Sequence, residues 1–281
     1  MDDSRCQGQA EESNRALWDE MARVHIRAYK EVELLRRGEE ILDPVELREL
    51  GDVGGKTMLH LQCHIGTDTL AWARRGAVVT GVDFSGQAIA CAEGLRGELG
   101  LEARFLESNV YDLRAILDER FDVVYTSRGI LCWLRDLNAW ARIVAHFLKP
   151  GGVFYLLDSH PILNTLVERA PGEYGFVYRY FHQAEPTVWE AGGPDYADPS
   201  HALQNPSHEW AWALSEIVNP VLAAGLVLES LNEHEHCFYK HLPSMTSDDG
   251  RTYRLPSCAG NLPLLFSLRA MKPIGRGDRK S

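Results

Sequence analysis

The chain alternates short apolar runs with longer segments whose apolar residues recur at helical spacing. Each run has the length of a buried strand, and each amphipathic segment is long enough to form a helix. The predicted strands are residues 58–61, 77–82, 103–106, 121–125 and 153–157. The predicted helices are residues 13–29, 44–51, 67–75, 87–99 and 133–148, and residues 1 to about 10 are predicted to be disordered. This order is typical of a doubly wound parallel sheet.

The alternation breaks at Pro161. Residues 161–208 are rich in aromatic residues, proline and glycine, and we expect them to cap the carboxyl edge of the sheet. Within them, alternating aromatics from Tyr174 to Tyr180 favour an edge strand or hairpin. The pattern then resumes with a helix at 210–224, which Pro220 must kink or restart, and with strands at 226–231 and 262–270.

These patterns predict three parts. Residues 1–50 form a helical segment that can either fold over the sheet as a lid or simply pack against it. Residues 51–273 form the α/β domain with its cap insert, and residues 274–281 form a tail.

Composition narrows the classes of protein. The chain has 281 residues, of which 45% are hydrophobic and 25% charged, as in ordinary globular domains. Its net charge of −11 argues against general binding to nucleic acid or to an anionic membrane, because both need a basic surface. No apolar run is as long as a membrane span, and the acidic first residues do not resemble a signal peptide. The six cysteines form no CxxC pair. We therefore expect a cytoplasmic protein with reduced thiols.

Residues 57–83 carry the clearest functional signal, because they read as strand, tight turn, helix and strand. Parallel pairing of the two strands would bring the turn at 62–66 beside Asp83, which ends the second strand. Ligands of open α/β sheets bind at this edge. A carboxylate there can accept two ribose hydroxyl groups, so a nucleoside-bearing cofactor is the first hypothesis. The alternative is that Asp83 merely begins a turn.

Three segments add a resemblance to a family. The run LHLQCHIGTDTLAWARRGAVVTGVDFSGQAI is similar to the cofactor segment of class I S-adenosylmethionine-dependent methyltransferases, in a bacterial branch that acts on small molecules. YTSRGILCWL and LKPGGVFYLLDSHP resemble the fourth-strand and fifth-strand segments of that branch. The resemblance implies a Rossmann-like seven-stranded sheet with an N-terminal helical lid and an inserted cap, and S-adenosyl-L-methionine as the cofactor.

The turn after the first strand departs from the usual motif of an acid followed by several glycines. His60 stands at the acid position, Gln62 and His64 replace two glycines, and only Gly66 remains. Loss of cofactor binding is one interpretation, but the branch that the chain resembles carries the same substituted turn. Gln62 and His64 could supply side-chain hydrogen bonds instead. The departure also argues against a nicotinamide-dependent dehydrogenase, because the dinucleotide-binding motif needs several glycines so that the backbone can approach a pyrophosphate.

The resemblance assigns roles along the carboxyl edge. The turn would lie against the methionine and ribose parts of the cofactor, Asp83 would hold the ribose hydroxyls, and Phe84 would lie against the adenine. Asn109 would accept from the adenine amino group, with Val110 or Tyr111 beside it, and residues 125–127 would pass near the transferable methyl. The predicted cofactor-binding residues are Gln62, Cys63, His64, Gly66, Asp83, Phe84, Asn109, Val110, Tyr111, Thr126 and Ser127.

Methyl transfer needs a base only when the acceptor loses a proton. His160, after the fifth strand, is the first candidate for a base or substrate contact, and His234 is the second; capping of the strand end and a surface position are their alternatives. His25, His182, His201 and His208 are weaker candidates. Glu233 to His236 contains metal-ligand types, but alternate residues of a strand face opposite ways, so we expect no metal.

The leading hypothesis is methyl transfer to a small organic metabolite, most readily through oxygen or nitrogen, by a monomer or homodimer without nucleic-acid or membrane partners. Two alternatives stay open. One is an enzyme that cyclises or rearranges S-adenosylmethionine, and the other is a non-catalytic module that only binds it.

Overall fold

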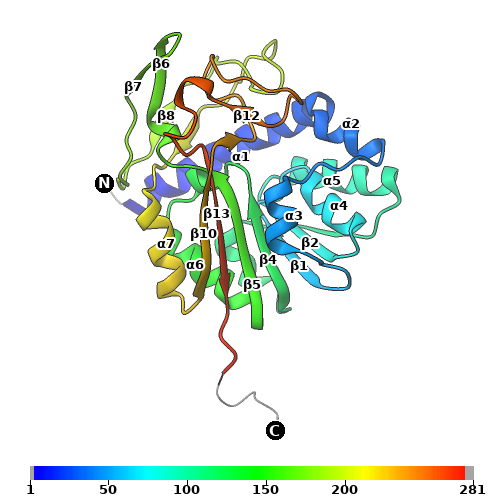
Figure 1. Cartoon of the computed structure of the whole chain (residues 1–281). Helices are drawn as coiled ribbons and strands as arrows, with labels where there is room; N and C mark the ends of the chain where they lie inside the picture. The colour runs from blue at the N-terminus through cyan, green and yellow to red at the C-terminus, as the bar shows by residue number, and fades with distance from the viewer. Residues whose placement is uncertain (1–2, 276–281) are drawn as a thin grey trace.

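Seven strands form one sheet in the order β10-β13-β5-β4-β1-β2-β3 in the computed structural model, which describes residues 3–275, with side chains from residue 8 onward (Figure 1). Strand β13 runs antiparallel to both of its neighbours, and the pairs β5–β4, β4–β1, β1–β2 and β2–β3 are parallel. The strands are β1 Thr57–Leu61, β2 Val78–Asp83, β3 Arg104–Glu107, β4 Phe121–Ser127, β5 Leu148–Ser159, β10 Val227–His234 and β13 Leu265–Met271. The predicted Rossmann-like seven-stranded sheet is confirmed.

Alternating side chains of the central strands enter two separate cores, because successive residues of a strand face opposite ways. On β1, Met58 joins the core beneath α4 and α5, and Leu59 joins the core beneath α6 and α7. On β4, Tyr125 and Val124 divide between the same two cores. Burial on both faces explains why these strands are continuous apolar runs in the sequence.

Helices α4 (Thr67–Arg74), α5 (Gly86–Leu99), α6 (Leu137–Phe147) and α7 (Leu214–Ala223) cover the sheet. Ser85 caps α5 by accepting from the backbone N–H of Ala88, and Gly66 is the N-cap of α4. Helix α6 begins later than predicted, because Asp136 caps it and residues 131–133 form a separate 3₁₀ turn. Pro220 lies within α7.

The N-terminal segment holds α1 (Asp3–Ala28), α2 (Lys30–Arg36) and α3 (Pro44–Leu50). The prediction of disorder up to about residue 10 is wrong for residues 3–10, which continue α1 and end in a buried Ala10; residues 1–2 lie outside the described part. Helix α2 was not predicted, whereas α3 has the predicted start at Asp43-Pro44, with a capping box between Asp43 and Glu46.

A cap lies at the carboxyl edge of the parallel strands, where Figure 1 also shows α1 crossing the sheet. It contains the hairpin β6 (Leu166–Ala170) and β7 (Glu173–Phe176), which confirms a hairpin that includes Tyr174, and the pair β8 (Thr187–Trp189) and β9 (Ser207–Glu209). Residues 236–264, with the short strands β11 (His236–Cys237) and β12 (Tyr253–Arg254), join it through a third apolar cluster made of Leu163, Leu166, Cys237, Leu242, Met245, Leu255 and Leu264. The cap is therefore built from two stretches of the chain rather than from 161–208 alone.

The predicted strand 226–231 is longer in the structure, because β10 extends through His234. Glu233 and His234 therefore lie on the strand and not after its end. None of the helices in residues 3–275 is both long and apolar enough to cross a membrane.

Candidate functional site

The turn after β1 keeps a left-handed backbone at positions where the side chains are not glycine. Gln62 has φ 54° and His64 has φ 49°, and Gly66 follows with φ 75°. Non-glycine residues adopt such angles only when the surroundings hold them there. The turn therefore has the shape of a glycine-rich turn with two polar side chains added.

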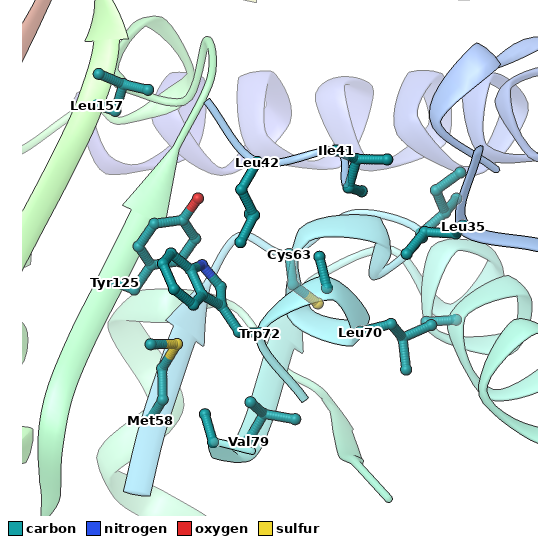
Figure 2. Packing of buried hydrophobic residues seen from close by; sticks show 14 of the residues in the cluster. Leu35, Ile41, Leu42, Met58, Cys63, Leu70, Trp72, Val79, Tyr125 and Leu157 are labelled. Atoms are coloured by element: carbon teal, nitrogen blue, oxygen red, sulfur yellow. The ribbon is translucent and has the colours of Figure 1, made fainter. Parts of the chain in front are cut away.

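Packing below the turn requires its remaining glycine. A Cβ on Gly66 would lie 2.8 Å from the ring of Phe105 and 2.9 Å from the Cβ of Ala92. Cys63 is buried in the same core, where Figure 2 shows it near Leu70, and its backbone N–H and C=O pair with Val82 and Gly66. The side chain of Cys63 thus supports the turn from the core side, away from the predicted cofactor crevice.

Unlike Cys63, Gln62 has side-chain polar atoms that no protein group among the described residues satisfies. Within the described part of the chain, both the Oε1 and the Nε2 of its side chain are buried and lack a hydrogen-bond partner. An unpaired buried amide costs about 1–3 kcal/mol, so this carboxamide is suited to a ligand that supplies both a donor and an acceptor.

Asp83 ends β2 and holds the turn in place. Its Oδ2 accepts from the backbone N–H of His64 at 2.8 Å, and its Oδ1 accepts from that of Ser85 at 2.9 Å. Burial raises the pKa of this carboxyl to about 6, although the two backbone hydrogen bonds oppose the shift. Each carboxylate oxygen retains lone pairs for a further donor, such as a hydroxyl group.

A cavity of about 300 Å³ opens beside Phe84, the residue after Asp83, at the ends of β2 and β3. Phe84, Ser108 and Asn109 line it from the sheet, and α1 covers it with Glu11, Glu12 and Arg15. The structure thus brings together two of the predicted cofactor residues, Phe84 and Asn109, under the N-terminal helix.

The three predicted residues after β3 hold the local structure. The Oδ1 of Asn109 accepts from the N–H of Tyr111 at 3.1 Å, and its Nδ2 donates to Glu11 at 3.3 Å. The hydroxyl of Tyr111 pairs with the backbone of Asp136, and Val110 is buried in the core beneath α6. Asn109 alone of the three has a side chain that lines the cavity.

Thr126 and Ser127 at the end of β4 are buried and bonded to neighbouring elements. Thr126 donates to the carbonyl of Leu61 at 3.2 Å, and Ser127 donates to Asp68 at 3.1 Å. Their side chains therefore tie β4 to β1 and α4.

A buried charged cluster, which the sequence pattern did not predict, adjoins this strand end. Arg128, with φ 64°, lies 3.2 Å from Glu46 and 3.5 Å from Asp68. Glu46 is fully buried and also accepts from the hydroxyl of Tyr125. Burial raises the pKa of Glu46, and the nearby arginine opposes the shift. His60 contacts Thr69 at 2.7 Å, and burial lowers its pKa to about 4.

Three residues connect the turn to α1 and to the cap: His25 and Asp195 are buried, and His64 is partly buried. The Nε2 of His25 lies 2.9 Å from the Oδ2 of Asp195, and its Nδ1 lies 2.9 Å from the Nε2 of His64. We call Asp195, His25 and His64 the relay. Burial lowers the pKa of His64. Burial also acts to raise the pKa of Asp195, but hydrogen bonds from His25 and from the backbone have the larger effect and hold the pKa of Asp195 below its usual value. From the sequence, His25 was only a weaker candidate for a base or substrate contact and Asp195 was not a candidate, because only the fold brings residues this distant together.

Aromatic rings surround the relay. Trp18 lies 4.9 Å from the ring of His64, and Tyr29 stacks on His25 at 4.4 Å. Tyr196 lies 4.8 Å from His25, and its hydroxyl contacts that of Tyr29. The side chain of Tyr196 is 58% exposed.

His160 and His234 lie toward the β13 side of the sheet. The Nδ1 of His160 accepts from the N–H of Ile162 at 3.2 Å, and its Nε2 lies 2.9 Å from Glu233. The Nε2 of His234 lies 3.1 Å from the hydroxyl of Ser267. Both nitrogens of His160 thus face protein groups. Within the described residues, His, Cys, Asp and Glu side chains form no group of three or more that could hold a metal ion.

Comparison with known proteins agrees with this geometry. Residues 59–154 match the family described as "Methyltransferase domain". A ubiquinone biosynthesis O-methyltransferase of Pseudomonas syringae is 33% identical over 108 residues, which are 38% of this chain and 46% of that protein. A cypemycin N-terminal methyltransferase of a Streptomyces species is 34% identical over 110 residues, 38% of this chain and 43% of that protein. The chain thus spans less than half the length of these relatives.

A solved structure resembles the fold over a longer range. An S-adenosylmethionine-dependent methyltransferase from Listeria monocytogenes superposes with a TM-score of 0.58 and 19% identity, over 81% of this chain and 97% of the other. The sheet order, the turn beside Asp83 and the matched segment therefore agree with the predicted family and with its cofactor. Residues 59–154 thus match a methyltransferase domain, and the fold of the chain is similar to that of an S-adenosylmethionine-dependent methyltransferase.

Proposed function

We propose that this protein binds S-adenosylmethionine at the carboxyl edge of β1, β2 and β3 and transfers its methyl group to an oxygen or nitrogen of a small organic metabolite. The observation that carries this proposal is that Asp83, which is hydrogen-bonded to the 62–66 turn, directly precedes Phe84, and Phe84 lines a cavity of about 300 Å³ together with Asn109. A cavity of this size lies at the lower end of the range for small-molecule sites. The adenine would enter it, and the ribose would lie against Asp83.

The unpaired carboxamide of Gln62 supports the same placement of the cofactor. It can donate to a carboxylate and accept from an ammonium group, and the amino-acid end of S-adenosylmethionine carries both. Bound S-adenosylmethionine supplies a methyl group that its sulfonium has already activated. The protein's contribution is then to align the acceptor with that methyl and to exclude water.

The acceptor would bind under the cap. Trp18 and Tyr29 lie against the ring of His64, and Tyr196 lies against that of His25; these flat apolar surfaces favour a small organic acceptor over a nucleic acid. His160 and His234 stay candidates for contacts with this acceptor. We expect the reaction to take place in the cytoplasm.

Calorimetry and product analysis test the proposal. The purified chain is titrated with S-adenosylmethionine and with S-adenosylhomocysteine, and it is then incubated with S-adenosylmethionine and pools of small hydroxyl, amine and carboxylate compounds. S-adenosylhomocysteine and a methylated acceptor in the mass spectrum support methyl transfer. Binding with a rearranged cofactor and no S-adenosylhomocysteine would favour cyclisation, and absence of binding would contradict the proposal.

A further inference from the structure

The relay has defined hydrogen-bond directions. A carboxylate only accepts, so the Nε2 of His25 must donate to Asp195 across their 2.9 Å contact. In neutral His25 the Nδ1 is then an acceptor, so the Nε2 of His64 must donate to it. The remaining nitrogen of the relay, the Nδ1 of His64, therefore carries a free lone pair.

That nitrogen is an exception among the polar atoms of the relay. Within residues 8–275 the Nδ1 of His64 is buried and has no hydrogen-bond partner, whereas the other two ring contacts are both 2.9 Å long. Buried polar atoms without partners are uncommon and mark places where a ligand completes the network. His64 is also in the turn that Asp83 holds at the cofactor edge.

We propose that the Nδ1 of His64 is the general base of the methyl transfer, with His25 and Asp195 as its positioning residues and a hydroxyl group as the acceptor. The proposal rests on the proposed function, since it needs S-adenosylmethionine at this edge. It replaces neither His160 nor His234 as a substrate contact. It assigns the proton-accepting role to a residue of the turn itself.

The step balances within the relay. The acceptor oxygen forms a bond to the methyl carbon, the carbon–sulfur bond breaks, and sulfur keeps that electron pair as the thioether of S-adenosylhomocysteine. The hydroxyl proton passes to the Nδ1 of His64, and the Nε2 proton of His64 can pass to the Nδ1 of His25. The resulting imidazolium then lies against the carboxylate of Asp195, which is itself fully buried at its side chain. The relay thus moves the positive charge to a group that stabilises it.

The surroundings of the relay indicate the kind of hydroxyl compound. The rings of Trp18 and Tyr29 lie 4.9 and 5.9 Å from the ring of His64, and the exposed ring of Tyr196 lies 4.8 Å from that of His25. Flat walls of this kind suit an aromatic ring. We therefore expect a phenol rather than an aliphatic alcohol.

A second histidine contact between α1 and the cap provides a matched control. The Nε2 of His201 lies 2.8 Å from Glu20, so this pair also ties the cap to α1 through a histidine and a carboxylate. It has no link to His64. A purely structural role for the relay would make His25 and His201 equivalent.

The first test is spectroscopic and needs no acceptor. The ring nitrogens of the full chain are observed by ¹⁵N nuclear magnetic resonance, and the signals are assigned from H25N, H64N and H201N. Asparagine tolerates the left-handed backbone at position 64. We expect neutral His64 with its proton on Nε2, and His25 with its proton on Nε2. A proton on the Nδ1 of His64 would overturn the proposal.

The second test measures turnover with catechol, 4-nitrophenol and 3,4-dihydroxybenzoate as hydroxyl probes and with benzoate as a carboxylate probe. H64N should lower kcat on the hydroxyl probes by ~10²–10⁴-fold, with the affinity for S-adenosylhomocysteine within threefold of the wild type. D195N should lower kcat less, and H201N should leave it unchanged. The base assignment would be overturned if H25N and H201N had equal effects on kcat. It would also be overturned if the protein bound S-adenosylmethionine but methylated only benzoate, or none of the probes. Absence of binding by the wild type would contradict the proposed function instead.

Discussion

The carboxylate of Asp83 accepts a hydrogen bond from the backbone N–H of His64 across 2.8 Å, and so the end of β2 fixes the shape of the turn that follows β1. The parallel pairing of Leu61 with Val82 brings these two places together. One acidic residue can therefore both stabilise the left-handed turn and offer its remaining lone pairs to a ribose.

Replacing Asp83 tests both roles. In D83A the N–H groups of His64 and Ser85 lose their acceptor, so the free energy of unfolding should fall by about 1–3 kcal/mol. The affinity for S-adenosylhomocysteine should fall more than tenfold, because the turn loses its support and the ribose loses its acceptor. Denaturant unfolding and calorimetry measure the two effects. Stability lost with affinity retained would separate Asp83 from the cofactor.

The raised pKa of Asp83 predicts a pH dependence of stability. The ordinary value is 3.8 and burial raises it to about 6, so between these values the folded protein holds a proton that the unfolded chain lacks. The contribution of Asp83 to the free energy of unfolding therefore decreases as pH rises from about 4 to 6, by up to about 3 kcal/mol, and is constant above. The raised pKa of Asp158 also makes the free energy of unfolding decrease as pH rises, whereas the lowered pKa of His60 makes it increase. The difference between wild type and D83N, measured by denaturant unfolding across this range, isolates Asp83; a flat difference would contradict the prediction.

Gln62 should show a trade between stability and binding. In Q62G the left-handed backbone is relieved and the unpaired carboxamide disappears, so the free energy of unfolding should rise by about 1–2 kcal/mol. The affinity for S-adenosylhomocysteine should fall about tenfold. Methylthioadenosine lacks the amino-acid end and serves as the control ligand, so its affinity should stay within twofold. Equal losses for both ligands would place the carboxamide elsewhere in the site.

The sequence predicted those parts of the molecule that depend on local pattern. The apolar runs around Leu59, Val124 and Phe154 are buried on both faces, so their length and composition identify them as strands. The helix caps Ser85 and Asp43 likewise depend on local sequence, because their side chains accept from the backbone a few residues further along. The glycine-poor turn was visible, but its retained left-handed angles were not.

What the sequence could not predict depends on long-range contacts. Asp195 meets His25 across 170 positions, and Arg128 meets Glu46 across 82, with no periodicity that links them. The loop at 236–264 joined the cap only through the apolar cluster around Leu163. His160 looked available as a strand-end histidine, because nothing in the sequence shows that Ile162 and Glu233 face its two nitrogens.

His160 remains a predicted contact for the acceptor, and H160A tests it. Turnover should decrease while the affinity for S-adenosylhomocysteine stays within about twofold, because His160 follows β5 and lies outside the turn that we propose holds the cofactor. E233Q is the comparison, since it changes the partner of His160 without removing the ring. If both variants lower the melting temperature equally and leave kcat unchanged, His160 only supports the strand end.

Arg128 should be a determinant of stability. In R128M the apolar stem is retained, but Glu46 and Asp68 lose the positive charge at 3.2 and 3.5 Å. Removing one partner from a buried ionic group typically lowers the free energy of unfolding by about 3–5 kcal/mol, because the remaining charges stay desolvated. The double variant R128M/E46Q should recover part of this loss. R36M is the matched surface control: Arg36 also contacts two acids, Glu33 and Glu98, but these are half exposed, so its loss should stay within about 1 kcal/mol. Similar small losses at both arginines, measured by denaturant unfolding at neutral pH, would show that the buried cluster is not held together by Arg128.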